Sequence, residues 1–344
     1  MAMVDLTIMG AGVLGLTIAW EAQSRGAKVR VIDPASVGAG SSGGVVGALQ
    51  PHTPDAWNDK KQFQLESLLM APALWSAVSE ASGIDPGYAA VGRLQPLSGE
   101  REVVLARARE AGALTHWGDS ASWSVVDTEA AGDWRPPSPT GLFVHDTLSA
   151  IVHPRRATQS LAAAVVAKGG EVLTSGNQDG AIVWATGWAG LQELSKISGK
   201  AIGNGVKGQA ALLAHDAAGA PQIYAENLHI IPHSDGTIGV GSTSEREFDA
   251  PNTTDEQLDD IITRAGEIMP VLRGARVIER WAGVRPRASS RAPLLGAWPG
   301  RPGQFVANGG FKIGFGMAPK VAEVMCDLIL DQNDTIPDGF RLDF

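Results

Sequence analysis

Three glycines near the start of the chain have the spacing of a turn that binds a dinucleotide. Gly10, Gly12 and Gly15 form a Gly-x-Gly-x-x-Gly motif. In such a motif the first glycine permits a tight turn, the second lets the backbone approach a pyrophosphate, and the third lets a helix pack on a strand. Asp33 follows about 20 residues later, within reach of a ribose hydroxyl. We therefore predict a dinucleotide site whose phosphates face a helix N-terminus.

Elements of the expected kind flank this motif. Residues 5–9 form a short apolar run, residues 13–25 have helical spacing, and residues 28–32 alternate in the manner of a strand. Strand, turn, helix and strand over about 30 residues make one βαβ unit. A packing turn without a ligand, and a turn-forming role for Asp33, stay open as alternatives, but this context favours the dinucleotide.

Helical and strand patterns continue along the chain. Residues 36–54 read as an ordered loop with a short helix, and residues 308–316 as a glycine-rich loop. A strand at 181–185 ends at Thr186 and Gly187, as in a parallel sheet, whereas short alternating segments between 203 and 243 indicate an antiparallel one. We predict helices over residues 62–81, 99–112, 155–168, 255–269 and 319–330, with Thr253 or Thr254 as the N-cap of the fourth.

Composition excludes several classes of protein. The formal charge of −9 and the lack of a basic cluster oppose nucleic-acid binding. The single cysteine, Cys326, excludes an internal disulfide, and the histidines show no metal-ligand spacing, so we expect no metal. The uncharged run at residues 6–20 is shorter than the ~20 residues of a membrane-spanning helix. We expect no transmembrane segment and a cytoplasmic location.

Five further segments carry a resemblance to a known family. They are residues 38–52, Val-Lys-Gly-Gln at 206–209, Ile-Pro at 231–232 with Gly-Val-Gly-Ser-Thr at 239–243, Trp-Ala-Gly-Val-Arg-Pro at 281–286, and Gly-Gly-Phe-Lys-Ile-Gly at 309–314 with Ala-Pro at 318–319. In this order they resemble the D-amino-acid oxidase (DAO) superfamily of FAD-dependent amine oxidoreductases, and within it the glycine oxidase (ThiO) branch. The resemblance covers nearly the whole chain.

The resemblance implies FAD as the dinucleotide. Ser41 and Ser42 would lie near its pyrophosphate, residues 46–48 near the isoalloxazine, and residues 310–316 along the far edge of that ring. Cys326 lies too late in the chain for the covalent link of sarcosine oxidase relatives, so the FAD is expected to be non-covalent. The expected cofactor residues are Gly10, Gly12, Val13, Leu14, Gly15, Asp33, Pro34, Ser41, Ser42, Val46, Gly47, Ala48, Thr186, Gly187, Gly310, Phe311, Lys312, Ile313, Gly314, Phe315 and Gly316.

Three residues are candidates for the substrate side. The family's carboxylate-binding arginine falls on Arg285, and an arginine in an apolar run is costly to bury without an anionic partner. A structural ion pair with an acid such as Glu279 is the alternative. A second cationic position of the branch falls on Lys312, for which a solvated surface role stays open. His229 aligns with the branch's active-site tyrosine and is either a polar substrate contact or a histidine satisfied within the sheet.

The implied fold is α/β with an α+β second lobe. It comprises a Rossmann-type FAD-binding domain of residues 1–54, 146–200 and 283–344, and a substrate domain of residues 55–145 and 201–282 with a mixed or antiparallel sheet. The stretch between Glu171 and Ala181 is too short for the extra strands that the family usually inserts there, and the adenine contact is not placed.

The implied reaction is FAD-dependent oxidative deamination of glycine or another small amino acid, such as sarcosine or a D-amino acid, by hydride transfer to flavin, with a place in thiamine biosynthesis. The expected partners are this substrate and oxygen or another electron acceptor, and a homo-oligomer stays open. A dehydrogenase that uses a quinone or carrier, an NAD-linked dehydrogenase and a non-catalytic flavin-binding protein are the alternatives.

Overall fold

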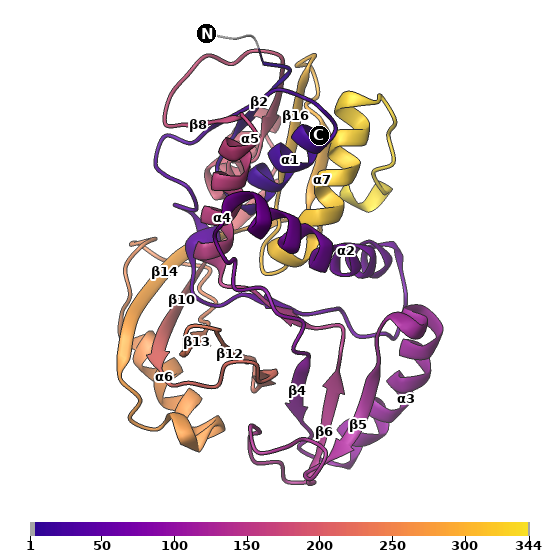
Figure 1. Cartoon of the computed structure of the whole chain (residues 1–344), viewed down its shortest axis with the longest axis vertical. Helices are drawn as coiled ribbons and strands as arrows, with labels where there is room; N and C mark the ends of the chain where they lie inside the picture. The colour runs from indigo at the N-terminus through magenta and orange to yellow at the C-terminus, as the bar shows by residue number, and fades with distance from the viewer. Residues whose placement is uncertain (1–3, 343–344) are drawn as a thin grey trace.

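The structure, a computed structural model, describes residues 4–342 and is built around two large sheets (Figure 1). The smaller of the two has six strands in the order β15-β16-β9-β1-β2-β8. All neighbours in it pair in parallel except β15 with β16. Its strands are β1 (Leu6–Met9), β2 (Val29–Ile32), β8 (Glu171–Leu173), β9 (Ala181–Trp184), β15 (Leu294–Ala297) and β16 (Gln304–Asn308).

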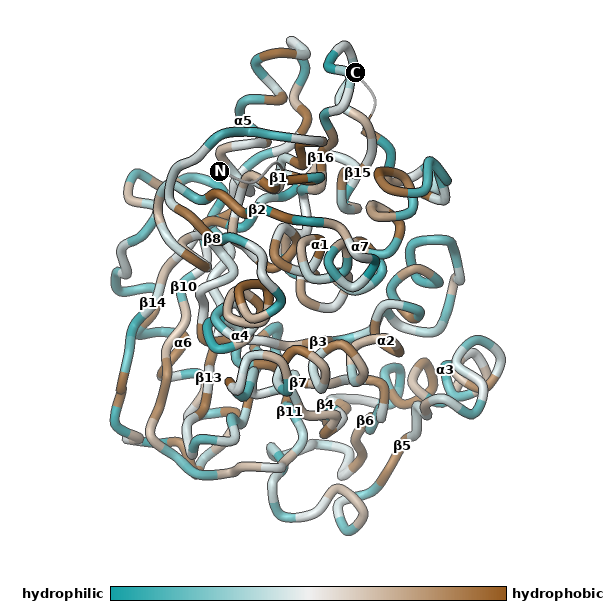
Figure 2. Tube along the Cα trace, turned by 45° about the horizontal axis from the view of Figure 1, so that its top comes forward, coloured by the Kyte–Doolittle hydropathy of each residue, from teal (hydrophilic) through white to brown (hydrophobic). Residues whose placement is uncertain are grey.

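The predicted βαβ unit is confirmed at the centre of this sheet. Strands β1 and β2 pair in parallel from Leu6 opposite Val29, and α1 (Val13–Ser24) connects them. Most α1 side chains are buried and apolar, which is typical of a helix enclosed by protein on several sides. In Figure 2 hydrophobic stretches lie on α1 and on the strands beside it. The same lobe contains α2 (Asp59–Ser82), α4 (Pro154–Ala167), α5 (Gly187–Ser198) and α7 (Gly314–Leu330).

The larger sheet has eight strands in the order β14-β10-β13-β12-β11-β4-β6-β5. Its pairs are antiparallel except β11 with β4, so the antiparallel texture predicted between residues 203 and 243 is confirmed. The strands are β4 (Arg93–Pro96), β5 (Trp123–Asp127), β6 (Leu142–Asp146), β10 (Gly203–Ala214), β11 (Gln222–Ala225), β12 (Leu228–Pro232), β13 (Thr237–Gly241) and β14 (Val277–Ala288). Helices α3 (Glu100–Trp117) and α6 (Glu256–Ile268) belong to this lobe (Figure 1).

Three predicted helix limits are wrong. Helix α6 is capped by Asp255, whose carboxylate accepts a hydrogen bond from Gln257 N at 3.0 Å, and not by Thr253 or Thr254. Helix α3 continues past Gly112, where a glycine is needed because a Cβ would lie 2.2 Å from the Pro54 carbonyl oxygen.

Helix α7 begins at Gly314 and not at Pro319. The predicted helix began at Pro319, and proline is favoured in the first turn of a helix. Here the end of the predicted glycine-rich loop, residues 314–316, forms the first turn, and Pro319 lies inside the helix. The glycine-rich segment thus joins the end of β16 to a helix N-terminus.

The domain limits stay a prediction, and two of them fall inside strands of the larger sheet. The limit at 145/146 lies within β6, and that at 282/283 lies within β14. The segment 36–54 contains a 3₁₀ turn at Ser41–Gly43 and the short strand β3 (Ala48–Leu49), which pairs with β7 (Ala150–Ile151). No helix in the described range is long and apolar enough to cross a membrane.

Candidate functional site

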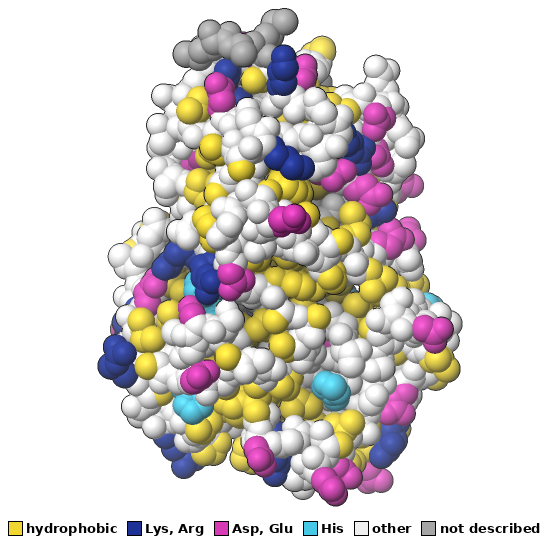
Figure 3. All heavy atoms as spheres, viewed as in Figure 1, with side chains coloured by type: hydrophobic (Ala, Val, Ile, Leu, Met, Phe, Trp, Pro, Cys, Tyr) yellow, Lys and Arg dark blue, Asp and Glu magenta, His cyan; other side chains and the backbone are white. Residues whose placement is uncertain are grey.

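A cavity of about 1280 Å³ is lined by residues of both sheets. This exceeds the ~300–1,000 Å³ of ordinary small-molecule pockets and suits a dinucleotide together with a small substrate. Figure 3 shows hydrophobic side chains gathered across the middle of one face, where the two lobes meet. Among the predicted site residues, all except Gly15 line the cavity.

The glycine motif forms one end of this cavity. Gly10 has φ +113°, and a Cβ there would lie 2.4 Å from the Ala185 carbonyl oxygen. Gly12 opens α1 beside the Ser42 hydroxyl, and both line the cavity. Gly15 lies beneath, where a Cβ would approach the Gly10 carbonyl oxygen to 2.1 Å. The three glycines therefore have the separate steric roles that the motif predicts: turn, open approach and helix packing.

The first turn of α1 presents backbone N–H groups to the same end. No acidic residue lies in this turn. Val13 N donates to the Ser42 hydroxyl at 3.1 Å, so the loop at 41–43 is joined to the helix N-terminus. A helix N-terminus without nearby carboxylates is a favourable position for phosphate.

Asp33 lies at the end of β2 and serves the turn as well as the cavity. One carboxylate oxygen accepts from Ala11 N at 2.9 Å and the other from Ala35 N at 3.0 Å. An ionised carboxylate accepts about four hydrogen bonds, so acceptor capacity remains on the cavity side. The turn-forming role and the ribose-binding role of this residue are therefore compatible.

Arg285 forms part of the cavity wall contributed by β14. Its Nη1 donates to the Ser242 hydroxyl at 3.1 Å, and its Nη2 donates to the Thr243 carbonyl at 2.6 Å. Its Nε has no acceptor among residues 4–342. Burial lowers the pKa of Arg285 to about 10, which still leaves the side chain charged near neutral pH.

The alternative was a structural ion pair of Arg285 with an acid such as Glu279, and Glu279 is not that partner. No carboxylate among residues 4–342 forms an ion pair with Arg285, although the more distant charge of Glu245 raises its pKa and so opposes the effect of burial. Glu279 lies on β14 as well, but its carboxylate pairs with Arg155 at 2.6 Å. The hydrogen-bond acceptors of Arg285 are a hydroxyl and backbone carbonyls, which are neutral. A buried guanidinium with only neutral acceptors favours binding of an anion in the cavity beside it.

A second cation lies near Arg285. Lys312 is exposed to the cavity, with its Nζ 5.8 Å from the centre of the Phe311 ring. The guanidinium carbon of Arg285 lies 6.0 Å from the same centre. Partial burial and the charge of Arg285 lower the pKa of Lys312. The two cations make this end of the cavity electropositive.

His229 lies on β12 opposite Tyr224 of β11, with ring centres 4.8 Å apart. Burial, followed by the charges of Arg93, Lys312 and Arg285, lowers the pKa of His229 to about 3, so its ring is neutral near pH 7. Its Nδ1 is buried without a partner in the described range. The ring both belongs to the sheet and lines the cavity.

Several cavity residues were not predicted from the sequence. Tyr224 and Asn227, joined by a 3.2 Å hydrogen bond, lie beside His229 in the wall. Ser242 lies within a recognised motif without a role assigned to it. Gln64 of α2 reaches the cavity and donates to the Gln50 carbonyl at 3.1 Å. These residues show no spacing that distinguishes them from ordinary strand, turn and helix residues.

A mixed sheet with a dinucleotide turn, facing a cationic wall on a second, mostly antiparallel sheet, is an arrangement that suits a flavin-dependent oxidoreductase. The chain belongs to the DAO family of FAD dependent oxidoreductases, whose model matches residues 5–328. It is an FAD-dependent amine oxidoreductase.

Named relatives of the chain agree with this family. The chain is 28% identical to the glycine oxidase of Pseudomonas putida, with 97% of this chain and 98% of that protein covered. It is 25% identical to the bifunctional protein ThiO/ThiG of Nostoc sp., with 95% of this chain and 53% of that protein covered. The crystal structure of glycine oxidase from Geobacillus kaustophilus superposes with a TM-score of 0.86 at 22% identity, covering 99% of this chain and 98% of that one, which shows the fold.

Proposed function

We propose that the chain oxidises glycine or another small amino acid, such as sarcosine or a D-amino acid, with non-covalent FAD. The observation that carries this proposal is Arg285, a buried cation with only neutral acceptors in the wall of the cavity that also contains the glycine motif. An α-amino acid supplies the carboxylate that Arg285 lacks and the amine that an amine oxidoreductase requires.

The cavity fits FAD by shape and by chemistry. A Cβ at Gly12 would lie 3.2 Å from the Ser42 hydroxyl, a tight contact, so glycine keeps the backbone open for a pyrophosphate there. Asp33 would accept from the ribose, while residues 46–48 and 310–316 would flank the isoalloxazine. Cys326 is buried in α7 against the Ile18 carbonyl and does not line the cavity, which supports non-covalent binding.

Arg285 would bind and orient the substrate carboxylate through charge-assisted hydrogen bonds, which are strengthened by burial. Lys312 adds positive potential that also favours the carboxylate. The His229 ring is neutral, so it adds no charge that would oppose binding of the amine. Bound FAD would supply the hydride acceptor. As the hydride leaves the substrate carbon, the lone pair of the neutral amine forms the C=N bond, the resulting iminium releases a proton to water, and hydrolysis of the imine releases ammonia, or an amine from an N-substituted substrate. The contribution of the protein to catalysis is thus to position the substrate, while the redox chemistry belongs to the cofactor.

A place in thiamine biosynthesis follows as part of the same proposal. The Nostoc relative is named as a bifunctional ThiO/ThiG protein, and the chain spans about half its length. Oxygen is the proposed electron acceptor, as the oxidase names of the relatives suggest.

Anaerobic flavin reduction tests the proposal. The FAD-loaded protein is mixed without oxygen with glycine, sarcosine, small D-amino acids and simple amines, and flavin absorbance is recorded. We expect bleaching by one or more small amino acids and none by amines without a carboxylate. Hydrogen peroxide formed in air would support oxygen as the acceptor, while bleaching without peroxide would indicate a quinone or carrier. Flavin that no amino acid reduces would contradict the proposal.

A further inference from the structure

A buried polar cluster lies behind Arg285, outside the cavity wall. We name it the β10 cluster: Lys207 and Gln209 of β10, with Glu245 and Asp255. Lys207 Nζ lies 3.2 Å from a Glu245 carboxylate oxygen and 3.5 Å from one of Asp255. Gln209 Nε2 donates to the other oxygens of the same two carboxylates, at 3.1 and 2.8 Å. Lys207 and Gln209 are both buried.

The β10 cluster joins the two ends of one segment to the sheet. Residues 242–255 connect the end of β13 to the start of α6. At the first end, the Lys207 and Glu245 backbones exchange hydrogen bonds of 2.9 and 3.0 Å. At the second end, Asp255 N donates to the Gln209 side-chain oxygen at 2.8 Å. Between these ties, Ser244, Pro251 and Asn252 line the cavity.

This segment supplies the acceptors that hold Arg285. Thr243 accepts from Arg285 through its carbonyl, and its hydroxyl is bonded both to Gln209 N, at 2.8 Å, and to Glu245. The Ser242 hydroxyl accepts a hydrogen bond from the other terminal nitrogen of the guanidinium, Nη1. Gly208 leaves room for the guanidinium to cross β10, since a Cβ there would lie 1.7 Å from Arg285 Nη2. A displacement of Thr243 would therefore be transmitted to Arg285.

We propose that the β10 cluster positions Arg285 for carboxylate binding by fastening residues 242–255 at both ends. Its members do not line the cavity, and their side chains act on Arg285 through Thr243 and Ser242. The Lys207 backbone carbonyl also accepts from Arg285 Nη2, at 3.4 Å. This inference rests on the proposed function, because it assumes that Arg285 binds a carboxylate. It adds Lys207, Gln209, Glu245 and Asp255 as residues that set the affinity of that site.

Two variants separate positioning from folding. Glu245→Gln removes a charge that pairs with Lys207. Asp255→Asn does the same at the other end and keeps a side chain that caps α6 well. Asp259→Asn is the matched control, because it breaks a 2.7 Å ion pair with Arg280 one turn further along the same helix, away from the cluster.

The measurement is acetate binding to the FAD-loaded protein, followed by perturbation of the flavin absorption spectrum. We expect the acetate dissociation constant to rise at least tenfold in Glu245→Gln and Asp255→Asn and less than twofold in Asp259→Asn. FAD content and melting temperature should stay near wild type, and the limiting rate of anaerobic flavin reduction should change less than the substrate affinity. If Glu245→Gln does not fold, Asp255→Asn decides.

Opposite outcomes have separate meanings. Unchanged acetate affinity in folded Asp255→Asn, or equal weakening in Asp259→Asn, would overturn the positioning role and leave the proposed function intact. No acetate perturbation in the wild type would contradict the carboxylate site itself, and with it the proposed function.

Discussion

Arg285 could be identified as a site residue from the sequence, but its hydrogen-bond acceptors could not. A charged side chain in the apolar run Trp-Ala-Gly-Val-Arg-Pro could be singled out from the sequence, because burying a charge needs a compensating partner. Its acceptors could not be predicted, since Ser242 and Thr243 lie more than 40 residues away and reach it only through the pairing of β10 with its neighbours. For the same reason, the sequence does not distinguish a substrate contact from a sheet role for His229.

Two buried histidines make stability depend on pH. His153, which precedes α4, lies against His233 with ring centres 4.6 Å apart, and His233 Nε2 contacts the Val45 carbonyl at 2.9 Å. Burial, followed by the charge of His233, lowers the pKa of His153 to about 4. The charge of Asp235 opposes this shift, whereas the charges of Arg156 and Arg155 add to it. Burial lowers the pKa of His233 as well.

We predict that the wild type loses stability as pH falls from about 6.5, the unfolded histidine value, toward 4. In that range the unfolded chain binds protons that the folded chain does not, whereas above it the effect is absent. His153→Phe should reduce the loss between pH 7 and pH 5 by about 2 kcal/mol. Urea unfolding at the two pH values measures the difference. Equal losses in both proteins would show that His153 does not titrate as described.

At the scale of elements, the glycine motif makes the sharpest prediction. Gly15→Ala places a Cβ where it would lie 2.1 Å from the Gly10 carbonyl oxygen, so α1 must move away from β1. We expect lower FAD occupancy and a loss of stability of about 1–3 kcal/mol, the usual cost of overpacking. Gly339→Ala, where a Cβ would meet no atom within 4 Å, is the control. FAD content and melting temperature measure both, and retained occupancy in Gly15→Ala would contradict the packing role.

Elements with strong local signals were predicted well, and their limits less well. The β1, α1 and β2 unit follows from apolar periodicity and glycine spacing within about 30 residues. The end of α3 depends on a tertiary contact, and the start of α7 depends on a proline that lies inside the helix. Hydrophobic periodicity predicts neither feature. Gly112, for example, reads as a helix end in sequence, but it is required inside α3 by Pro54.

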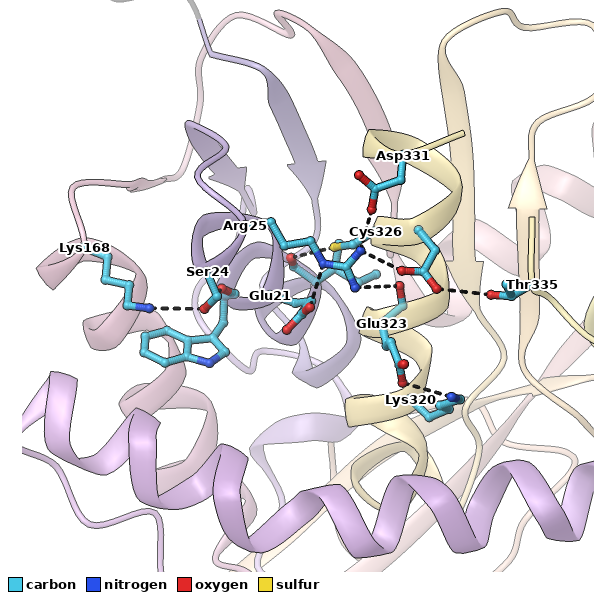
Figure 4. A network of polar contacts seen from close by, with 12 residues as sticks. Glu21, Ser24, Arg25, Lys168, Lys320, Glu323, Cys326, Asp331 and Thr335 are labelled. Atoms are coloured by element: carbon cyan, nitrogen blue, oxygen red, sulfur yellow. Dashed lines mark hydrogen bonds and ion pairs between the residues drawn. The ribbon is translucent and has the colours of Figure 1, made fainter. Parts of the chain in front are cut away.

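At the scale of the whole molecule, the two ends of the chain meet in one lobe. Figure 4 shows Arg25, which follows α1, directed at α7. Its Nη1 lies 2.6 Å from Asp327 and 2.9 Å from Asp331, and its Nη2 donates to the Glu323 carbonyl at 3.3 Å. On the other side of α1, Lys168 donates to Ser24 at 3.1 Å. This network joins segments about 300 residues apart in sequence.

Arg25→Ala should weaken the attachment of α7 to α1. The pair is partly exposed, so we expect a loss of only about 1 kcal/mol, seen as a fall in melting temperature of about 1–3 °C that shrinks at high salt. Arg341→Ala, which breaks ion pairs with nearby Asp334 and Asp338, is the control and should have a smaller effect. An equal effect of the two variants would contradict a role for Arg25 in joining the helices.

The sequence predicted only in outline that the C-terminal strands β15 and β16 join the same sheet as β1 and β2. The interleaved textures and the family resemblance indicated a discontinuous arrangement. The order β15-β16-β9-β1 depends on which strand edges were free for pairing, and such long-range choices leave little local signal. It is this arrangement that brings residues 310–316 to the cavity that contains the glycine motif.

The central claim is that one cavity holds FAD and, through Arg285, a carboxylate substrate. The most direct measurement compares the FAD-loaded wild type and Arg285→Met in anaerobic titrations with the amino acid that best reduces the flavin. We predict that both retain FAD and that the variant needs roughly 10- to 100-fold more amino acid for reduction, the effect of losing hydrogen bonds to a charged group. Equal titrations, with FAD retained in both proteins, would contradict the account.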